Sequence, residues 1–172
     1  RTFSVSELRL WKDNPRFLEP VPDENSAIAA LLRDGGSKLL NLASDIAQRN
    51  SLNPADLPIV LMIDGVPTVL EGNRRIAALK LLRNPEFAPF PDQQEQFSAI
   101  SKVGIGPELV LCSVAQSLDE ARPWIELRHT GENNGVGILP WSSFQIQNFA
   151  GTKNTHSRRA AIFLMGVAEL YV

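Results

Sequence analysis

Near the N-terminus, the hydrophobic residues first alternate with polar ones over a short stretch and then recur with helical spacing in two segments. Thr2–Trp11 alternates weakly, which favours a short strand and a turn. Asp23 can cap a helix over Glu24–Arg33, and the pair Gly35–Gly36 is expected to end it. A second helix is predicted over Ser37–Gln48, because its apolar residues recur with helical spacing. These apolar residues are Leu39, Leu42, Ala43 and Ile46.

The middle of the chain predicts a β-hairpin that runs directly into a helix. Ile59–Ile63 is a run of five apolar residues, too short for a helix, and Asp64 with Gly65 is a hairpin turn signal. Pro67–Leu70 is expected to pair back as the second strand. Arg74–Leu82 carries apolar residues on one side and predicts a helix.

The pattern is less regular in the next part of the chain. Asn84–Gly106 contains several prolines and a glutamine-rich patch, and it is predicted to be an insertion with one short helix. Glu108–Val114 has the composition of a strand. A helix follows to about Arg128, and its start is open between Leu118 and Pro123.

Glycine and proline divide the remaining residues. Thr130–Leu139 contains three glycines and is expected to be a loop. Pro140 suits the first turn of a helix that continues through Phe149. A last helix is predicted over Ser157–Tyr171, so residues 152–172 are expected to be a C-terminal helical segment with which a following module would begin.

Composition limits the classes of protein that this pattern can represent. The 172 residues include 17 Lys and Arg against 19 Asp and Glu, and the net charge of −2 argues against gripping nucleic acid through bulk positive charge. Cys112 is the only cysteine and there are two histidines, which excludes an internal disulfide and a cysteine- or histidine-rich metal site. No apolar run approaches the roughly 18 residues of a membrane span, so no membrane partner is expected and the cytoplasm is the expected location. Because the chain begins at Arg1 and is still apolar where it ends, we expect it to be part of a longer protein.

The most informative segment lies where the predicted hairpin ends and the helix begins. Gly72 lets the backbone approach a ligand closely, and Arg74 and Arg75 supply forked donors that suit phosphate oxygens. A helix N-terminus also carries unpaired amide donors and a partial positive charge. These features together predict a phosphate site. The alternative is an ordinary exposed helix start whose arginines pair with surface carboxylates, and the residues alone leave both open.

A second candidate segment is rich in glycine and in amide side chains. Glu132, Asn133 and Asn134 offer oxygen ligands of the kind that Mg²⁺ prefers together with substrate phosphates. The alternative is a turn whose Asn and Gly residues tolerate positive φ. The Asn-Pro-Arg sequence at Asn14–Arg16 is by itself only a turn.

The order of these segments resembles the N-terminal domain of the ParB/sulfiredoxin superfamily. The resemblance is carried by Asn-Pro-Arg near the start, Leu-Pro-Ile-Val with a hairpin, and a Gly-x-Arg-Arg-x-x-Ala segment at Gly72–Ala78 that matches the ParB box. Glu132 and Asn133, just before a helix, are similar to the start of the family's Glu-Asn-x-x-Arg segment. The resemblance extends to Gly151, so we expect one domain over residues 1–151.

The resemblance implies an α/β (α+β) fold, with a small mixed β-sheet flanked by helices. In ParB this domain binds CTP with Mg²⁺ and hydrolyses it slowly, and relatives bind ATP or ADP, act as nucleases or phosphorylate free serine. Arg16 would lie beside the pocket, and Glu132 and Asn133 would lie near the metal and the phosphates. The residues that would hold the triphosphate are, by position, Gly72, Asn73, Arg74 and Arg75.

This sequence also departs from the family pattern. Asn73 stands where the sulfiredoxins have their cysteine, so their thiol chemistry is not expected. The Glu-Asn segment continues as Asn134–Val136 without the arginine of ParB, which leaves the choice between CTP and ATP open. The insertion at 84–106 is longer than a plain ParB would have, and no helix-turn-helix is visible after Gly151.

The leading hypothesis is a CTP- or ATP-binding domain of a DNA-associated protein. We expect DNA to be bound through regions outside this chain. We expect nucleotide binding to change the shape of the domain or its dimer state, so a second copy of the chain is a candidate partner. Any turnover would be slow, Mg²⁺-dependent hydrolysis, with Glu132 as the expected catalytic carboxylate and metal ligand and Glu71 as the other available carboxylate. One alternative is a DNA-binding or protein-interaction module with a degenerate nucleotide pocket. Another is a metal-dependent nuclease, which is disfavoured because the sequence lacks the clustered carboxylates of a two-metal site.

Overall fold

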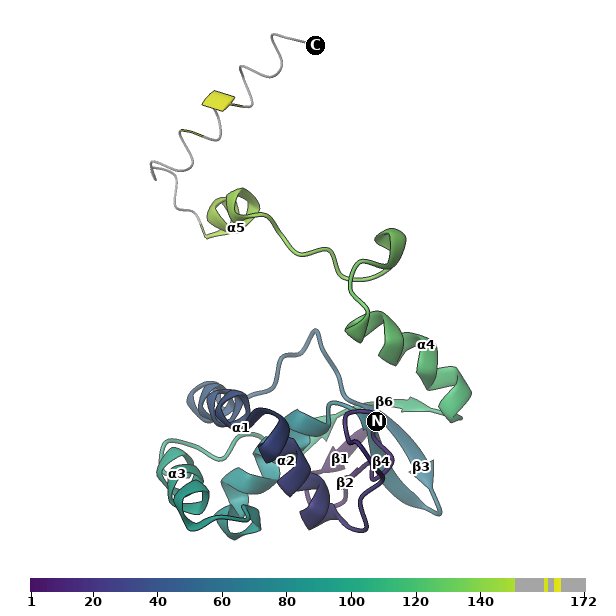
Figure 1. Cartoon of the computed structure of the whole chain (residues 1–172), viewed down its shortest axis with the longest axis vertical. Coiled ribbons are helices and arrows are strands. Elements are labelled where there is room, and N and C mark those ends of the chain that lie inside the picture. The colour runs from purple at the N-terminus through teal and green to yellow at the C-terminus, as the bar shows by residue number, and fades with distance from the viewer. Residues whose placement is uncertain (151–159, 161–162, 165–172) are drawn as a thin grey trace. The chain divides into compact units, whose positions relative to one another are not determined.

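The computed structural model describes residues 1–150, 160, 163 and 164 (Figure 1). The chain divides into two compact units, residues 1–125 and residues 126–172, and each is described by itself. Both helices and strands are present, so the fold is mixed α and β. No helix among the described residues is long and apolar enough to cross a membrane.

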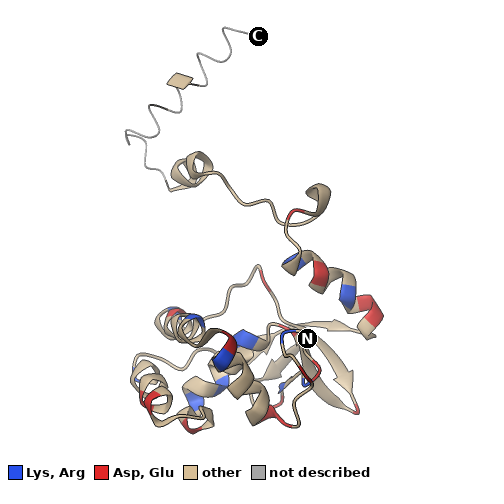
Figure 2. Cartoon of the chain, in the orientation of Figure 1, with Lys and Arg blue, Asp and Glu red and all other residues tan. Residues whose placement is uncertain are grey.

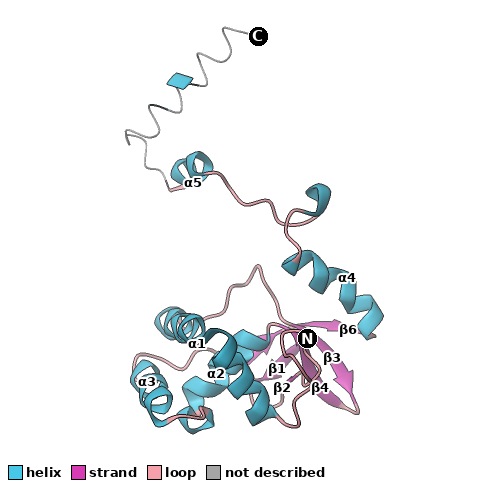
Figure 3. Cartoon of the chain, viewed as in Figure 1, coloured by secondary structure: helices cyan, strands magenta, loops and turns pink. Residues whose placement is uncertain are grey.

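The first unit contains a four-stranded mixed sheet beside its helices (Figure 3). Its order is β2 (Arg9–Leu10), β4 (Val66–Glu71), β3 (Ile59–Ile63) and β6 (Ser113–Ala115). The β3–β4 hairpin is antiparallel, whereas β2 and β6 run parallel to their neighbours. The prediction of a small mixed sheet with flanking helices is therefore confirmed, as is the hairpin.

A second, two-stranded sheet corrects one sequence prediction. Glu108–Val114 was expected to be one strand, but β5 (Leu109–Leu111) pairs antiparallel with β1 (Thr2–Ser4), whereas β6 joins the other sheet. The chain changes partners at Cys112, whose backbone N–H donates to the carbonyl oxygen of Arg1 at 2.8 Å. The switch depends on strands distant in sequence, which local composition does not reveal.

Three helices lie beside the sheet: the first two contact β2, and the third packs on the other two. They are α1 (Glu24–Arg49), α2 (Asn73–Arg83) and α3 (Pro91–Ser101) (Figure 1). Helix α1 contains the two predicted helices, joined across Gly35, where the backbone is not helical. Their apolar side chains form the main core with Val60 and Val69 of the sheet.

The insertion and the following helix behave as the sequence suggested, with two details added. Residues 84–106 contain a short 3₁₀ helix, η1 (Pro85–Phe87), as well as α3. Helix α4 (Leu118–His129) begins at Leu118 and includes Pro123. Its buried Ala121 packs with Ile59, Leu70 and Ala115 in a smaller cluster apart from the main core.

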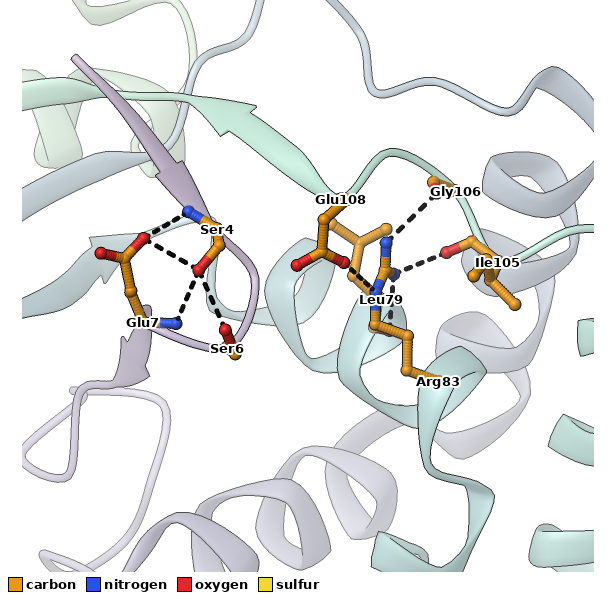
Figure 4. A network of polar contacts seen from close by, with 8 residues as sticks. All are labelled: Ser4, Ser6, Glu7, Leu79, Arg83, Ile105, Gly106 and Glu108. Atoms are coloured by element: carbon orange, nitrogen blue, oxygen red, sulfur yellow. Dashed lines mark hydrogen bonds and ion pairs between the residues drawn. The ribbon is translucent and has the colours of Figure 1, made fainter.

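The C-terminal end of α2 is fixed by Arg83 (Figure 4). Its Nε donates to the Glu108 carboxylate at 2.9 Å, and its Nη atoms donate to the carbonyl oxygens of Leu79, Ile105 and Gly106. The figure also shows the turn after β1, where the Glu7 carboxylate accepts from the backbone N–H and the hydroxyl of Ser4. The contacts of Arg83 hold the C-terminal end of α2 to residues 105–108.

In the second unit, η2 (Asn133–Gly135) precedes α5 (Ser143–Phe149). The expected helix start at Pro140 is wrong, because Ser142 and Gln145 form a capping box that begins the helix later. Residues 133–150 contain no charged side chain, as the uniform tan of α5 and the segment before it shows in Figure 2. The predicted helix over Ser157–Tyr171 lies almost wholly outside the described residues.

Candidate functional site

Gly72 forms the junction between β4 and α2. Its φ of 94° lies in the left-handed region that glycine adopts without strain. A Cβ at this position would lie 3.1 Å from the Cβ of Pro58 and 3.1 Å from Nη2 of Arg75. Both the backbone angle and the close packing therefore require glycine here.

Asn73, the first residue of α2, is buried and joins three parts of the chain. Its Oδ1 accepts the backbone N–H of Trp11 at 3.0 Å, and its Nδ2 donates to the carbonyl oxygen of Leu70 at 3.2 Å. The amide thus connects the residue after β2, the end of β4 and the start of α2. These contacts give Asn73 a structural role.

Arg75 is engaged by carboxylates of the chain itself. Its Nη2 lies 2.6 Å from the Glu71 carboxylate, and its Nη1 lies 2.9 Å from the Asp56 carboxylate. Nη1 also donates to the carbonyl oxygen of Asp56. The Arg75 and Glu71 side chains are only 11% and 13% exposed, whereas Asp56 is 43% exposed. For Arg75, the structure shows the ion pairing that the sequence left as the alternative.

Arg74 differs from its neighbour. It is half-buried, and its side chain makes no hydrogen bond or ion pair with any other described residue. The first turn of α2 contains no acidic residue and has no side-chain cap. In this turn, Gly72 accepts the backbone N–H groups of Arg75 and Ile76, which leaves those of Asn73 and Arg74 without an acceptor among residues 1–150. A helix start of this composition suits an anion.

Arg16 belongs to the segment between β2 and α1. Its guanidinium Nη1 lies 3.1 Å from the Asp34 carboxylate, and both side chains are exposed. Asn14 accepts the backbone N–H of Arg16 in a local turn. The bond from Trp11 to Asn73 fixes the beginning of this segment to the start of α2.

Glu132 and Asn133 lie in the second unit and are exposed. The carbonyl oxygen of Glu132 accepts the backbone N–H groups of Gly135 and Gly137. Asn133 and Asn134 adopt positive φ angles of 45° and 54°. The segment therefore forms the left-handed turn that the sequence left as an alternative, with the Glu132 carboxylate at its surface.

Sequence reasoning missed a buried cation on α2. Lys80 is 5% exposed, and its Nζ lies 3.2 Å from the Glu24 carboxylate, which also accepts the backbone N–H of Leu10 at 3.1 Å. Burial lowers the pKa of Lys80, and the Glu24 carboxylate opposes that shift. A lysine within the apolar run Ile76–Leu82 was the sequence signal that could have revealed this pair.

The described residues contain no group of three or more His, Cys, Asp or Glu side chains that could hold a metal ion. An exposed carboxylate and amide such as those of Glu132 and Asn133 nevertheless have the oxygen chemistry to bind Mg²⁺ together with phosphate oxygens. Neither a protein-family model, nor a curated protein, nor a solved structure matches the chain.

Proposed function

We propose that this chain is a ParB-like domain that binds a nucleoside triphosphate, CTP or ATP, at the start of α2. The observation that carries the proposal is Arg74, a cation without a partner among the described residues at a helix start without an acidic cap. The proposal also rests on the resemblance of Gly72–Ala78 to the ParB box. Within a longer DNA-associated protein, the bound nucleotide would control shape or dimer state.

The start of α2 offers the positive charge and the hydrogen-bond donors that suit a phosphate group. The partial positive charge of a helix N-terminus and free backbone amides favour an anion, and a guanidinium can donate two parallel hydrogen bonds to phosphate oxygens. Arg74 provides that guanidinium with no internal carboxylate to displace. Mg²⁺ bound with the nucleotide would neutralise the remaining phosphate charge. Glu132 and Asn133, in the second unit, offer oxygen ligands of the kind that Mg²⁺ prefers.

Calorimetry with CTP, ATP and GTP in the presence of Mg²⁺ tests the proposal. Arg74→Ala should weaken binding about 10- to 150-fold, because a charge-assisted hydrogen bond contributes roughly 1.5–3 kcal/mol. Arg33→Ala, which removes an exposed arginine from α1, is the matched control and should bind as the wild type does. Absence of binding by all three nucleotides, or equal binding by Arg74→Ala, would rule the site out.

Slow hydrolysis is the enzymatic part of the proposal. Glu132 is the proposed carboxylate, on the basis of the resemblance and its exposure. Phosphate release with Mg²⁺ should fall in Glu132→Gln, whereas nucleotide binding by Arg74 should persist. An undiminished rate would remove Glu132 from any catalytic role.

A second candidate is a DNA-binding or protein-interaction module with a degenerate pocket. It is favoured by Asn73 and Arg75, which are both engaged within the chain. DNA retention without nucleotide that weakens steeply with added salt would support this candidate, because contacts to the phosphate backbone release counterions. Retention that depends on nucleotide and not on salt would favour the first candidate.

A further inference from the structure

Asn134 and Gly135 form the one asparagine–glycine pair in the sequence, and they lie in η2 of the second unit. Both residues are exposed, and Asn134 adopts a left-handed backbone conformation with φ 54° and ψ 36°. Residues 133–150 contain no charged side chain. A reaction that creates a charge at Asn134 would therefore change the character of this segment.

The residue that follows an asparagine controls the reactivity of the asparagine side chain. The backbone nitrogen of that next residue can attack the carbonyl carbon of the side-chain amide. A glycine has no side chain to hinder the approach, and its backbone rotates freely. Every other asparagine of the chain is followed by a larger residue, so Gly135 makes Asn134 the least hindered of them.

The turn around Asn134 can open without disturbing a packed core. The N–H groups of Gly135 and Gly137 donate to the carbonyl oxygen of Glu132 at 3.0 and 2.9 Å, and none of residues 131–136 is buried. Because the nitrogen of Gly135 is engaged in the closed turn, its attack requires the turn to open. Exposed segments with local hydrogen bonds open at a low free-energy cost.

We propose that Asn134 is a site of spontaneous deamidation. The backbone nitrogen of Gly135 forms a bond to Cγ of Asn134, the Cγ–Nδ2 bond breaks, and the proton of that nitrogen leaves with the amide group as ammonia. Water then opens the five-membered imide. Cleavage between the ring nitrogen and Cγ gives aspartate, and cleavage between the ring nitrogen and the backbone carbonyl carbon gives isoaspartate.

Either product places a new carboxylate close to Glu132, in a segment that otherwise has no charge after that residue. Isoaspartate also lengthens the backbone by a methylene group, which is incompatible with the hydrogen bonds from Gly135 and Gly137 to Glu132 in their present geometry. Water is the only co-reactant. The inference is therefore independent of the proposed nucleotide binding.

Asn50 provides a matched comparison within the same chain. It is exposed and has nearly the same backbone conformation, with φ 50° and ψ 33°, but it ends α1 and is followed by Ser51. Asn73, which is 5% exposed and is followed by an arginine, is the negative control. These asparagines separate the effect of a following glycine in an exposed turn from that of left-handed backbone alone.

Peptide mapping by mass spectrometry tests the proposal on the whole chain, incubated in mildly alkaline buffer. Asn134 should convert at least about tenfold faster than Asn50, which corresponds to a barrier lower by about 1.4 kcal/mol. Asn73 should remain unconverted over the same time. Conversion of Asn134 should slow in mildly acidic buffer, because the attacking nitrogen must lose its proton.

Two variants identify the product by ion-exchange chromatography. Asn134→Asp is the standard for the aspartate form, and Asn134→Gln should not form the early acidic species. A rate at Asn134 less than about tenfold above that at Asn50 overturns the inference. An acidic species that forms as fast in Asn134→Gln as in the wild type also overturns it, because the charge would then arise elsewhere. The comparison of Asn134 with Asn50 uses the wild type alone, so it does not depend on how the variants fold.

Discussion

The start of α2 and the Glu132–Asn133 segment correspond to the two halves of the family resemblance, and the fold holds them very differently. At α2, Gly72, Asn73 and Arg75 are buried, and the side chains of Asn73 and Arg75 bond to residues from three other segments. Around Glu132 the side chains are exposed, and the hydrogen bonds lie between residues close in sequence. The first segment is thus part of the packed interior of residues 1–125, whereas the second presents its carboxylate and amide at the surface.

The largest expected effect is a difference in the free energy of unfolding between variants of Arg75 and Arg74. Arg75→Met should lower the free energy of unfolding by about 3–5 kcal/mol, because it breaks two ion pairs of a guanidinium whose side chain is only 11% exposed. Arg74→Met should change it by less than about 0.5 kcal/mol, since Arg74 has no side-chain partner to lose among the described residues. Urea denaturation followed by circular dichroism measures both. Equal losses in the two variants would contradict the assignment of a structural role to Arg75 alone.

Gly72→Ala should have the next largest effect. A left-handed backbone costs a non-glycine residue about 1–2 kcal/mol, and the new Cβ would also press on Pro58 and Arg75, so we expect a loss of about 2–3 kcal/mol in the same denaturation experiment. Gly65→Ala is the control, because Gly65 has a similar φ of 78° but open space around its Cβ position. If the two variants lose the same stability, the close approach of Pro58 does not matter.

Much of this architecture could be predicted from local sequence. The hairpin, the break at Gly35 and the helix after Gly72 follow from turn formers and apolar spacing within a few residues. The division of residues 108–114 between two sheets could not be predicted, because it depends on pairing with Thr2–Ser4 and Ile59–Leu61. The start of α5 was predicted wrongly because a proline signal was given more weight than the Ser142 capping box.

The sequence identified the candidate segment but not the partners of its side chains. Gly-Asn-Arg-Arg is visible in the sequence, and a helix does begin there, at Asn73. The partners of the neighbouring side chains are Trp11, Asp56 and Glu71, and two of these lie far from α2 in sequence. Tertiary contacts therefore decide which member of a motif is free for a ligand.

A smaller, pH-dependent effect on the stability of the first unit is expected from Lys80. Because burial lowers its pKa in the folded state, the unfolded state binds more protons at pH values just below the usual lysine value of 10.5. Lys80 should therefore contribute stability that rises with pH towards 10.5, with a slope of up to about 1 kcal/mol per pH unit. Buried Cys112, whose thiol pKa is raised to about 11, contributes a slope of the opposite sign, so the Lys80 contribution is the difference between the wild type and a Lys80 variant. Lys80→Met should lack this component, whereas exposed Lys38→Met should retain it. Parallel pH profiles for the wild type and Lys80→Met would contradict the role of Lys80.

The smallest effect is expected in the second unit, at Phe149. Its ring is 80% exposed and contacts Trp141 with a centroid distance of 5.1 Å, so Phe149→Ala should cost about 0.5–1.5 kcal/mol within α5 and less than about 0.5 kcal/mol in the first unit. Cys112 reports the first unit selectively: burial raises its thiol pKa to about 11, so it should react with a thiol reagent at neutral pH only after that unit opens. Phe97→Ala, which removes a fully buried ring, is the positive control and should cost about 3–5 kcal/mol by the same thiol measurement. A Phe149→Ala variant whose Cys112 reacts as fast as in Phe97→Ala would mean that the stability of the first unit depends on Phe149, and the contrast between the two regions would then be wrong.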